Sequence, residues 1–257
     1  MIARRTLPPE FEAWNARWHA PHGRNGRLSR LIPALRGPFG FQANNSTRRV
    51  EYPWAYGRIA AHRAAVGGRA LDVVEIGGSL AGLQWVLSRD GHRVTNVDPG
   101  LDARGTGWEV NAERHRTLSK RFGAPVTLVP TTLAAAALPD ASVDVLLSVS
   151  TIEHFAPADL EEFAAHAARV LRPDGIVVLT IDLFLNVAPF CAATSNEYGT
   201  NVDVCALLQR AGLTLREGVP GELYGFPEFK AGTILEGLAN YTIGGYPALA
   251  QCVVASR

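Results

Sequence analysis

Short apolar runs alternate with amphipathic segments between residues 70 and 182 of the chain. Short β-branched apolar runs are typical of strands that are buried on both faces. Five such runs predict strands: Leu71–Ile76, Arg93–Val97, Val126–Val129, Val143–Val149 and Ile176–Ile181. Apolar residues at helical spacing predict helices between them, over Leu80–Arg89, Trp108–Phe122 and Ala158–Leu171. Because strand and helix alternate, we expect a doubly wound α/β fold whose sheet is parallel and carries helices on both faces.

The alternation loosens after Asp182. The pattern there predicts a helix over Val202–Ala211 and two closing strands, Leu213–Arg216 and Leu249–Ala255. Residues 217–247, between these strands, are rich in glycine and aromatic residues. So long a connection in a compact domain is usually functional or carries structure of its own. We therefore treat residues 217–247 as an insert within a main domain that covers 67–257.

Residues 1–66 lack this alternation and predict a helical cap or lid in front of the main domain. Short helices fit Glu10–His19 and the segment from Glu51 to about Ala65. Trp14 and Trp18 stand four residues apart, which puts both on one face of the first helix. We interpret them, with Phe11, as a stripe that docks this helix on the domain; an aromatic wall for a substrate is the alternative. The basic stretch Arg24–Arg36 is interpreted as a solvated face, with contact to an anionic substrate as its alternative.

Composition and charge place the protein among ordinary folded globular proteins. Its 257 residues are 47% hydrophobic and 19% charged, and 25 basic against 24 acidic residues leave a formal net charge of +1. A chain with so balanced a charge has no strongly positive electrostatic field to attract a polyanion, and we expect no nucleic-acid partner. Three cysteines without paired spacing are typical of thiols in a reducing compartment. Prolines follow the first basic residues where a signal peptide needs apolar ones, and the longest apolar run is broken by Asp182 and Asn186. We expect a cytoplasmic protein without a membrane partner.

The turn after the first predicted strand has the composition of a ligand-binding loop. The segment 73–82 ends a buried strand in small residues and passes at once toward a helix, and small side chains let a ligand approach the backbone. Gly77-x-Ser79-x-x-Gly82 is a blurred version of the dinucleotide-binding fingerprint, although similar loops also serve as tight turns. Asp98 ends the second strand, where a carboxylate can accept both hydroxyls of a ribose. Because the loop and the acid occur together, we favour a site for a nucleoside-type ligand over the interpretation that both are turns without a binding role.

Nicotinamide-dependent and S-adenosyl-dependent enzymes share this arrangement, so the distinction depends on segments further along the chain. Residues 138–155, which run from Leu138-Pro139-Asp140 to Glu153-His154-Phe155, resemble the fourth-strand region of class I S-adenosylmethionine-dependent methyltransferases. Residues 171–179, with Pro173-Asp174-Gly175, resemble the loop of those enzymes into the fifth strand. The closest resemblance is to the small-molecule group that includes ubiquinone and menaquinone methylases. It implies a Rossmann-like seven-stranded sheet with an antiparallel last strand, and S-adenosyl-L-methionine as the cofactor.

The resemblance also implies roles for individual residues. Glu75 would support the loop and the amino group of the cofactor, and Asp98 would hold its ribose hydroxyls. The floor under the methionine and ribose portions would be formed by Gly77, Gly78, Ser79 and Gly82. The end of the fourth strand would line the site near the sulfonium with Ser148, Ser150 and Thr151.

The chain departs from the family pattern at two places. Ser79 stands where the central glycine of the loop is usual, and Pro130-Thr131-Thr132 replaces the acid that often contacts the adenine amine after the third strand. Either the adenine is recognised by backbone and apolar contacts, or the site has degenerated.

No motif marks a catalytic base, because in-line displacement from a sulfonium mainly requires alignment of the reactants and exclusion of water. His154 is the first candidate, since it follows the fourth strand and its ordinary pKa suits a general base. A structural histidine at a helix start is the alternative. His19 and His22, in the predicted lid, are weaker candidates for the base. Candidates for contact with the substrate are Glu197, Tyr198 and Tyr224. Asp182 and Asn186 could contribute to a metal site, but nothing completes a ligand set, and we predict no metal.

These observations predict an S-adenosylmethionine-dependent methyltransferase that O-methylates a small molecule, with a sugar or natural-product hydroxyl as the acceptor. N- or C-methylation would use the same scaffold. A nicotinamide-dependent oxidoreductase and a non-catalytic S-adenosyl-binding partner subunit are the alternatives from other classes.

Overall fold

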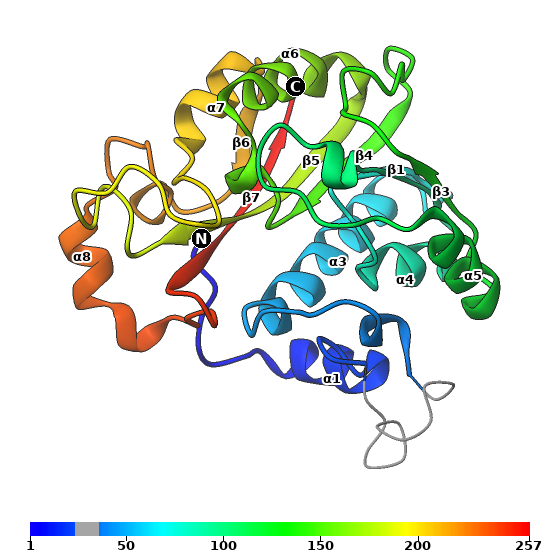
Figure 1. Ribbon diagram of the computed structural model, residues 1–257, viewed down its shortest axis with the longest axis horizontal. Helices are drawn as coiled ribbons and strands as arrows, with labels where there is room; N and C mark the ends of the chain where they lie inside the picture. Colours follow the sequence, from blue (N-terminus) through cyan, green and yellow to red (C-terminus); the bar gives the residue numbers. More distant parts are fainter. Residues whose placement is uncertain (24–35) are drawn as a thin grey trace.

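The computed structural model describes residues 1–23 and 36–257. Its centre is a seven-stranded sheet in the order β3-β2-β1-β4-β5-β7-β6 (Figure 1). The strands are β1 (Asp72–Ile76), β2 (Arg93–Val97), β3 (Val126–Val129), β4 (Val143–Val149), β5 (Leu171–Phe184), β6 (Thr214–Glu217) and β7 (Ala248–Ser256). β7 is antiparallel to both β5 and β6, and the pairs from β3 to β5 are parallel. The predicted fold class is therefore confirmed.

Helices cover both faces of the sheet (Figure 1). The α-helices are α1 (Pro9–Trp18), α3 (Arg48–Ala65), α4 (Leu83–Arg89), α5 (Ala112–Phe122), α6 (Pro157–Val170), α7 (Val204–Arg210) and α8 (Ala231–Glu236). Short 3-10 helices lie at η2 (Pro38–Gly40), η3 (Gly100–Asp102), η4 (Ile152–His154), η5 (Pro220–Glu222) and η6 (Leu238–Asn240). None of the helices in the two described ranges combines the length and the apolar character needed to cross a membrane.

Two apolar layers hold the sheet between the helices. On one face, Phe163 of α6 and Leu207 of α7 pack with Leu146 of β4. On the other face, Trp54 of α3 and Leu83 of α4 pack with side chains of β1 and β4. Because helices cover both faces, β4 is buried at each of its positions, which explains why five of its seven residues are apolar.

The N-terminal region packs directly on the sheet. Trp14 and Trp18 are buried, and Trp14 meets Phe39 edge to face at a centroid distance of 5.7 Å, so the docking interpretation of this stripe is confirmed. Ile59 of α3 belongs to the same apolar layer as the strands. The predicted basic stretch Arg24–Arg36 lies outside the described residues except for Arg36. The domain boundary at residue 66 stays a prediction.

Several elements begin at other residues than the pattern predicted. The helix predicted from Trp108 starts at Ala112, because the side chain of Asn111 accepts the N–H of Arg114 (2.9 Å) and caps the helix there. The helix predicted from Leu80 starts only at Leu83. Conversely, the helix predicted from Glu51 starts at Arg48, and the fifth strand begins at Leu171 with a register irregularity opposite Val143–Val145.

The insert at 217–247 carries structure of its own, as its length suggested. It contains η5, α8 and η6, and it packs through Ile234 and Tyr241 against Leu183 and Leu249 of the central strands. Gly245 and Tyr246, near its end, line the pocket described below.

Candidate active site

A pocket of about 630 Å³ lies at the carboxyl ends of β1, β2 and β4. This is the edge at which parallel α/β sheets bind their ligands. Eight of the predicted site residues line it, namely Glu75, Gly77, Gly78, Ser79, Asp98, Ser150, Thr151 and His154. Gly82 and Ser148 are outside its described lining. Gly82 lets Phe39 and Pro38 pack against the loop, and the hydroxyl of Ser148 lies 3.4 Å from the carbonyl of Ile76 inside the sheet.

The loop after β1 closely approaches the segment that follows β4. Gly77 has a φ of 69°, and a Cβ placed on it would lie 2.1 Å from Cγ2 of Thr151. Ser79, at the position of the usual glycine, also has a positive φ, of 43°. The Gln84 side chain donates to the carbonyls of Ser79 (3.1 Å) and Ala81 (2.9 Å), and so helps to fix this turn. Polar side chains therefore hold the conformation that glycine would otherwise adopt freely.

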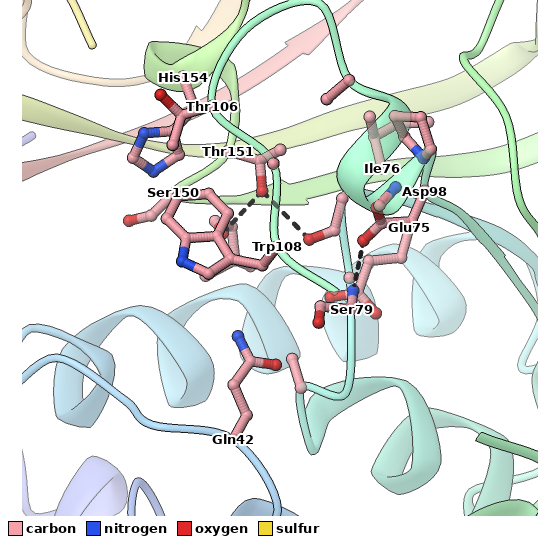
Figure 2. A pocket seen from close by; sticks show the side chains of 18 of the residues that line it. Gln42, Glu75, Ile76, Ser79, Asp98, Thr106, Trp108, Ser150, Thr151 and His154 are labelled. Carbon is pink, nitrogen blue, oxygen red and sulfur yellow. Dashed lines mark hydrogen bonds between the residues drawn. The ribbon is translucent and has the colours of Figure 1, made fainter. Parts of the chain in front are cut away.

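Asp98 binds the same loop from the end of β2. Its Oδ2 accepts the N–H of Ser79 at 2.7 Å (Figure 2), and its Oδ1 accepts the N–H of Gly100 at 2.8 Å. Burial raises the pKa of this carboxyl, and the two backbone N–H groups oppose the rise. Asp98 also lines the pocket, where a ribose could donate hydrogen bonds to its carboxylate oxygens.

Glu75 is a buried carboxyl at the floor of the pocket. Its Oε2 has no hydrogen-bond partner among the described residues, although the side chain is fully buried. Burial, and secondarily the nearby Asp98, raise the pKa of Glu75 to about 8. An unpaired buried carboxyl is costly unless a ligand completes its bonding, and the α-ammonium of S-adenosylmethionine has the chemistry to do so.

Beyond the ends of β2 and β3, where the resemblance implies that the adenine binds, the pocket is lined by Val97, Thr131, Thr132 and Leu133. These residues supply apolar surface, backbone groups and hydroxyls where the family usually has an acid. The lining fits the first of the two expected explanations, in which the adenine is held without a carboxylate.

The N-terminal region also contributes to the cofactor site. Residues 41–45, among them Gln42 (Figure 2), line the pocket, and Oε1 of Gln42 accepts the N–H of Leu80 at 3.1 Å. The sequence predicted a lid but did not identify Gln42. No local pattern marks this residue, because its contact with the loop spans 38 positions.

Polar and aromatic side chains surround the opposite end of the pocket, which we call the acceptor end. They are Arg48, Tyr52, Trp108, His154, Tyr198 and Tyr246. Trp108 meets His154 edge to face at 4.6 Å, and the ring of Tyr198 stacks on that of Tyr246 at 4.3 Å. Of the weaker sequence candidates, Tyr198 lines the pocket, whereas His19, His22, Glu197 and Tyr224 are outside its described lining.

His154 is held in one orientation at this end (Figure 2). Its Nδ1 bonds to the carbonyl of Tyr198, and because a carbonyl only accepts, Nδ1 carries the proton. Burial lowers the pKa of His154 to about 4, so the ring is neutral at pH 7 with Nε2 unprotonated. Nε2 lies 3.8 Å from Oε1 of the buried Glu153.

No metal site is evident in the part of the chain that the structure describes, where no group of three or more His, Cys, Asp or Glu side chains is arranged to hold an ion. Asp182, considered above as a metal ligand, instead accepts a hydrogen bond from Tyr246, and its Oδ1 lies 3.0 Å from the hydroxyl of Ser150.

Comparison with known families identifies the central part of the chain. Residues 74–179, which run from β1 into β5, match the family described as the methyltransferase domain. No curated protein matches the sequence. The matched segment contains the loop after β1, Asp98 and both segments on which the sequence resemblance depends, and it gives no support to the nicotinamide-dependent alternative.

Solved structures show the same fold over the whole chain. One is the 1,6-didemethyltoxoflavin-N1-methyltransferase of Burkholderia thailandensis with bound 1,6-didemethyltoxoflavin and S-adenosylhomocysteine, at 19% identity and a TM-score of 0.52, covering 100% of this chain and 95% of that one. Another is the magnesium protoporphyrin IX methyltransferase of Synechocystis PCC 6803 with bound S-adenosylmethionine (12% identity, TM-score 0.51, covering 98% and 99%).

A third structure shows that the fold does not determine which reaction is catalysed. The 4+2 cyclase SpnF has 14% identity and a TM-score of 0.57, with 99% of this chain and 98% of that one covered. The fold is therefore shared by different chemistries. Taken together, the comparisons show that residues 74–179 match a methyltransferase domain and that the chain has the fold of S-adenosylmethionine-dependent methyltransferases.

Proposed function

We propose that this protein is an enzyme that transfers the methyl group of S-adenosylmethionine to a hydroxyl oxygen of a small molecule, such as a sugar or a natural product. The observation that carries the proposal is the continuity of one pocket from Glu75 to Tyr246. Its volume of about 630 Å³ falls in the range typical of sites for small organic ligands. The segment 41–45 and the end of the insert also line it, so both long segments outside the matched domain contribute to the site.

The polarity of the acceptor end supports a hydroxyl as the nucleophile. A hydroxyl must lose its proton as the new bond forms, and it therefore benefits from a neighbouring proton acceptor. Tyr246 and the unprotonated Nε2 of His154 lie at this end and can accept a hydrogen bond from an acceptor hydroxyl. The cofactor supplies an activated methyl group, and the residues of this chain orient the acceptor and exclude water.

Cofactor binding and methyl transfer should be measured separately. Calorimetric titration with S-adenosylmethionine and S-adenosylhomocysteine tests the cofactor site, with Asp98→Ala as a variant that should lose binding. The protein is then incubated with methyl-labelled S-adenosylmethionine and a panel of phenols, catechols, sugars and heteroaromatic amines, and products are assigned by mass spectrometry and NMR.

Methyl ethers as products would support the proposal. Products methylated only on nitrogen or carbon would contradict the O-methyl assignment while keeping the methyltransferase. Tight cofactor binding without turnover of any acceptor in the panel would favour the non-catalytic S-adenosyl-binding partner instead.

A further inference from the structure

A buried polar network lies directly behind the acceptor end. At its centre, the hydroxyl of Ser150 contacts three charged side chains: Nη1 of Arg48 at 2.6 Å, Oε1 of Glu51 at 2.9 Å and Oδ1 of Asp182 at 3.0 Å. Glu51 and Asp182 are fully buried. Ser150 has a φ of 41°, a conformation that a serine adopts only where its surroundings enforce it.

The hydrogen bonds around Ser150 require one more proton than the Ser150 hydroxyl can supply. Ser150 accepts from Arg48, and its single proton can go either to Glu51 or to Asp182, but not to both. Glu51 is otherwise bonded as a carboxylate, since its oxygens also accept from Arg48 and from Thr180. With the Ser150 proton directed to Glu51, Oδ1 of ionised Asp182 lies 3.0 Å from the Ser150 oxygen with no proton between them. This contact disfavours the ionised form of Asp182, so the geometry favours uptake of a proton by its carboxyl.

Tyr246 connects Asp182 to the pocket. Its hydroxyl donates to Oδ2 of Asp182 at 3.1 Å, and its side chain lines the acceptor end. The stacked ring of Tyr198 fixes its orientation. An acceptor hydroxyl that donates to the oxygen of Tyr246 would thus be one hydrogen bond away from the Asp182 carboxyl.

The charges around Asp182 set its affinity for a proton. Glu51 and Arg48 face it from α3, Glu153 from η4, and Tyr246 from the end of the insert. Burial, and secondarily Glu51, raise the pKa of Asp182 to about 6. A base works best when its pKa lies near the working pH, and in this respect Asp182 is better matched than His154, whose pKa burial lowers to about 4.

We propose that Tyr246 is the catalytic residue that contacts the acceptor hydroxyl, and that Asp182 behind it receives the proton. The proposal rests on O-methylation as the proposed function. As the acceptor oxygen forms its bond to the methyl carbon, the methyl–sulfur bond breaks and sulfur keeps the electron pair. The acceptor proton passes to the Tyr246 oxygen, and the Tyr246 proton passes to Oδ2 of Asp182. Asp182 returns the proton to solvent after product release.

The first test measures the proton on Asp182 and needs no acceptor. In protein labelled with ¹³C at aspartate carboxyls and saturated with S-adenosylhomocysteine, the Asp182 resonance is assigned by its loss in Asp182→Asn. We expect a midpoint of about 6. Tyr246→Phe should raise this midpoint, because the lost hydrogen bond favours the carboxylate, whereas Tyr198→Phe should leave it unchanged. An ordinary aspartate midpoint, or no response to Tyr246→Phe, would overturn the proposal.

The second test uses a hydroxylated acceptor from the screen above. Tyr246→Phe should lower kcat by about 10²–10⁴-fold and abolish the rise of kcat through pH 6, while the Kd for S-adenosylhomocysteine stays within about twofold. Tyr224→Phe, outside the described pocket lining, is the control. If Tyr246→Phe keeps the rate and its pH profile while His154→Gln loses them, the base is His154 and the proposal is wrong. If the screen finds no O-methylated product, the proposed function fails, and the carboxyl titration still decides where the proton is held.

Discussion

The backbone N–H of Ser79 donates to Oδ2 of Asp98 at 2.7 Å, which ties the loop after β1 to the end of β2. Ser79 replaces the glycine usual at this point and has a φ of 43°, which is unfavourable for a residue with a side chain. The same carboxylate accepts the N–H of Gly100 through Oδ1. Asp98 therefore holds two loops of the site in place and also lines the pocket.

Asp98→Asn should weaken both the loop and the ligand site. An amide keeps the shape of the side chain but replaces one acceptor oxygen with a donor, so either the Ser79 or the Gly100 N–H is left unpaired. We expect the free energy of unfolding to fall by about 1–3 kcal/mol in urea titrations. We also expect S-adenosylhomocysteine to bind at least about tenfold more weakly by calorimetry, since a ribose contact to a charged group is lost.

The neighbouring exposed Asp102 provides the matched control. Asp102→Asn should change neither quantity. Cofactor affinity in Asp98→Asn equal to that of the wild type would show that the carboxylate serves only the loops.

Binding of the cofactor should release a proton from Glu75. In the free protein the pKa of about 8 keeps Glu75 protonated at pH 7. An ammonium group placed beside it favours the carboxylate, so affinity should increase by up to about tenfold per pH unit as the pH rises toward 8. Calorimetric titration with S-adenosylhomocysteine, in two buffers of different ionisation enthalpy, should detect release of up to about one proton at pH 7.

Glu75→Gln isolates this effect because glutamine mimics the protonated side chain. The variant should bind more weakly and lose both the proton release and the pH dependence. Equal proton release in wild type and variant would assign it to another group, and Asp98, whose pKa burial also raises, would be the first to examine.

The fold and the cofactor edge could be predicted because their signals are local. Runs such as Val143–Val149 are mostly apolar because both faces of the sheet are covered. The loop after β1 and Asp98 each lie in a short contiguous segment. The start of α5 was misplaced although its signal was present, since Asn111 is a favourable capping residue just before the helix.

The acceptor end could not be predicted because it is assembled from distant segments. Arg48 and Ser150 are 102 positions apart, and Ser150 and Asp182 are 32 apart, with no fixed spacing that a motif could record. Glu51 was interpreted only as the start of a helix, and Asp182 only as a residue for a metal. Tyr246 was interpreted only as part of the glycine- and aromatic-rich insert at 217–247. Its hydroxyl could be given a role only because the fold brings it beside Asp182 of β5.

Gly77→Ala should disrupt the loop through a defined collision. The added Cβ would lie 2.1 Å from Cγ2 of Thr151, and the φ of 69° disfavours any side chain. We expect the free energy of unfolding to fall by about 3 kcal/mol or more, from backbone strain of about 1–2 kcal/mol plus the overlap. Urea titration measures this loss, and calorimetry should show weaker binding of S-adenosylhomocysteine.

Gly67→Ala is a control that introduces backbone strain without a steric overlap. It has a φ of 82°, and no atom lies within 4 Å of a Cβ placed on it, so Gly67→Ala should cost only about 1–2 kcal/mol. Adding Thr151→Ala to Gly77→Ala should recover part of the loss, and strictly additive effects would show that the two side chains do not collide.

His154 should remain neutral throughout the physiological range, with its proton on Nδ1. Burial lowers the pKa of the ring to about 4, and the carbonyl of Tyr198 fixes the tautomer. Because the folded pKa lies below the ordinary value near 6.5, the unfolded chain takes up a proton first as the pH falls. The stabilisation due to the neutral ring is therefore present above pH 6.5 and is lost as the pH falls toward 4.

Long-range ¹H–¹⁵N NMR spectra, assigned with His154→Gln, should show the Nδ1–H pattern at pH 7 and a midpoint of about 4. A midpoint near 6.5 would remove the argument for Asp182 over His154, because both groups could then take the acceptor proton at the same pH. A proton on Nε2 at pH 7 would show that the bond to Tyr198 does not form, and the ring would then offer the pocket a donor in place of a base.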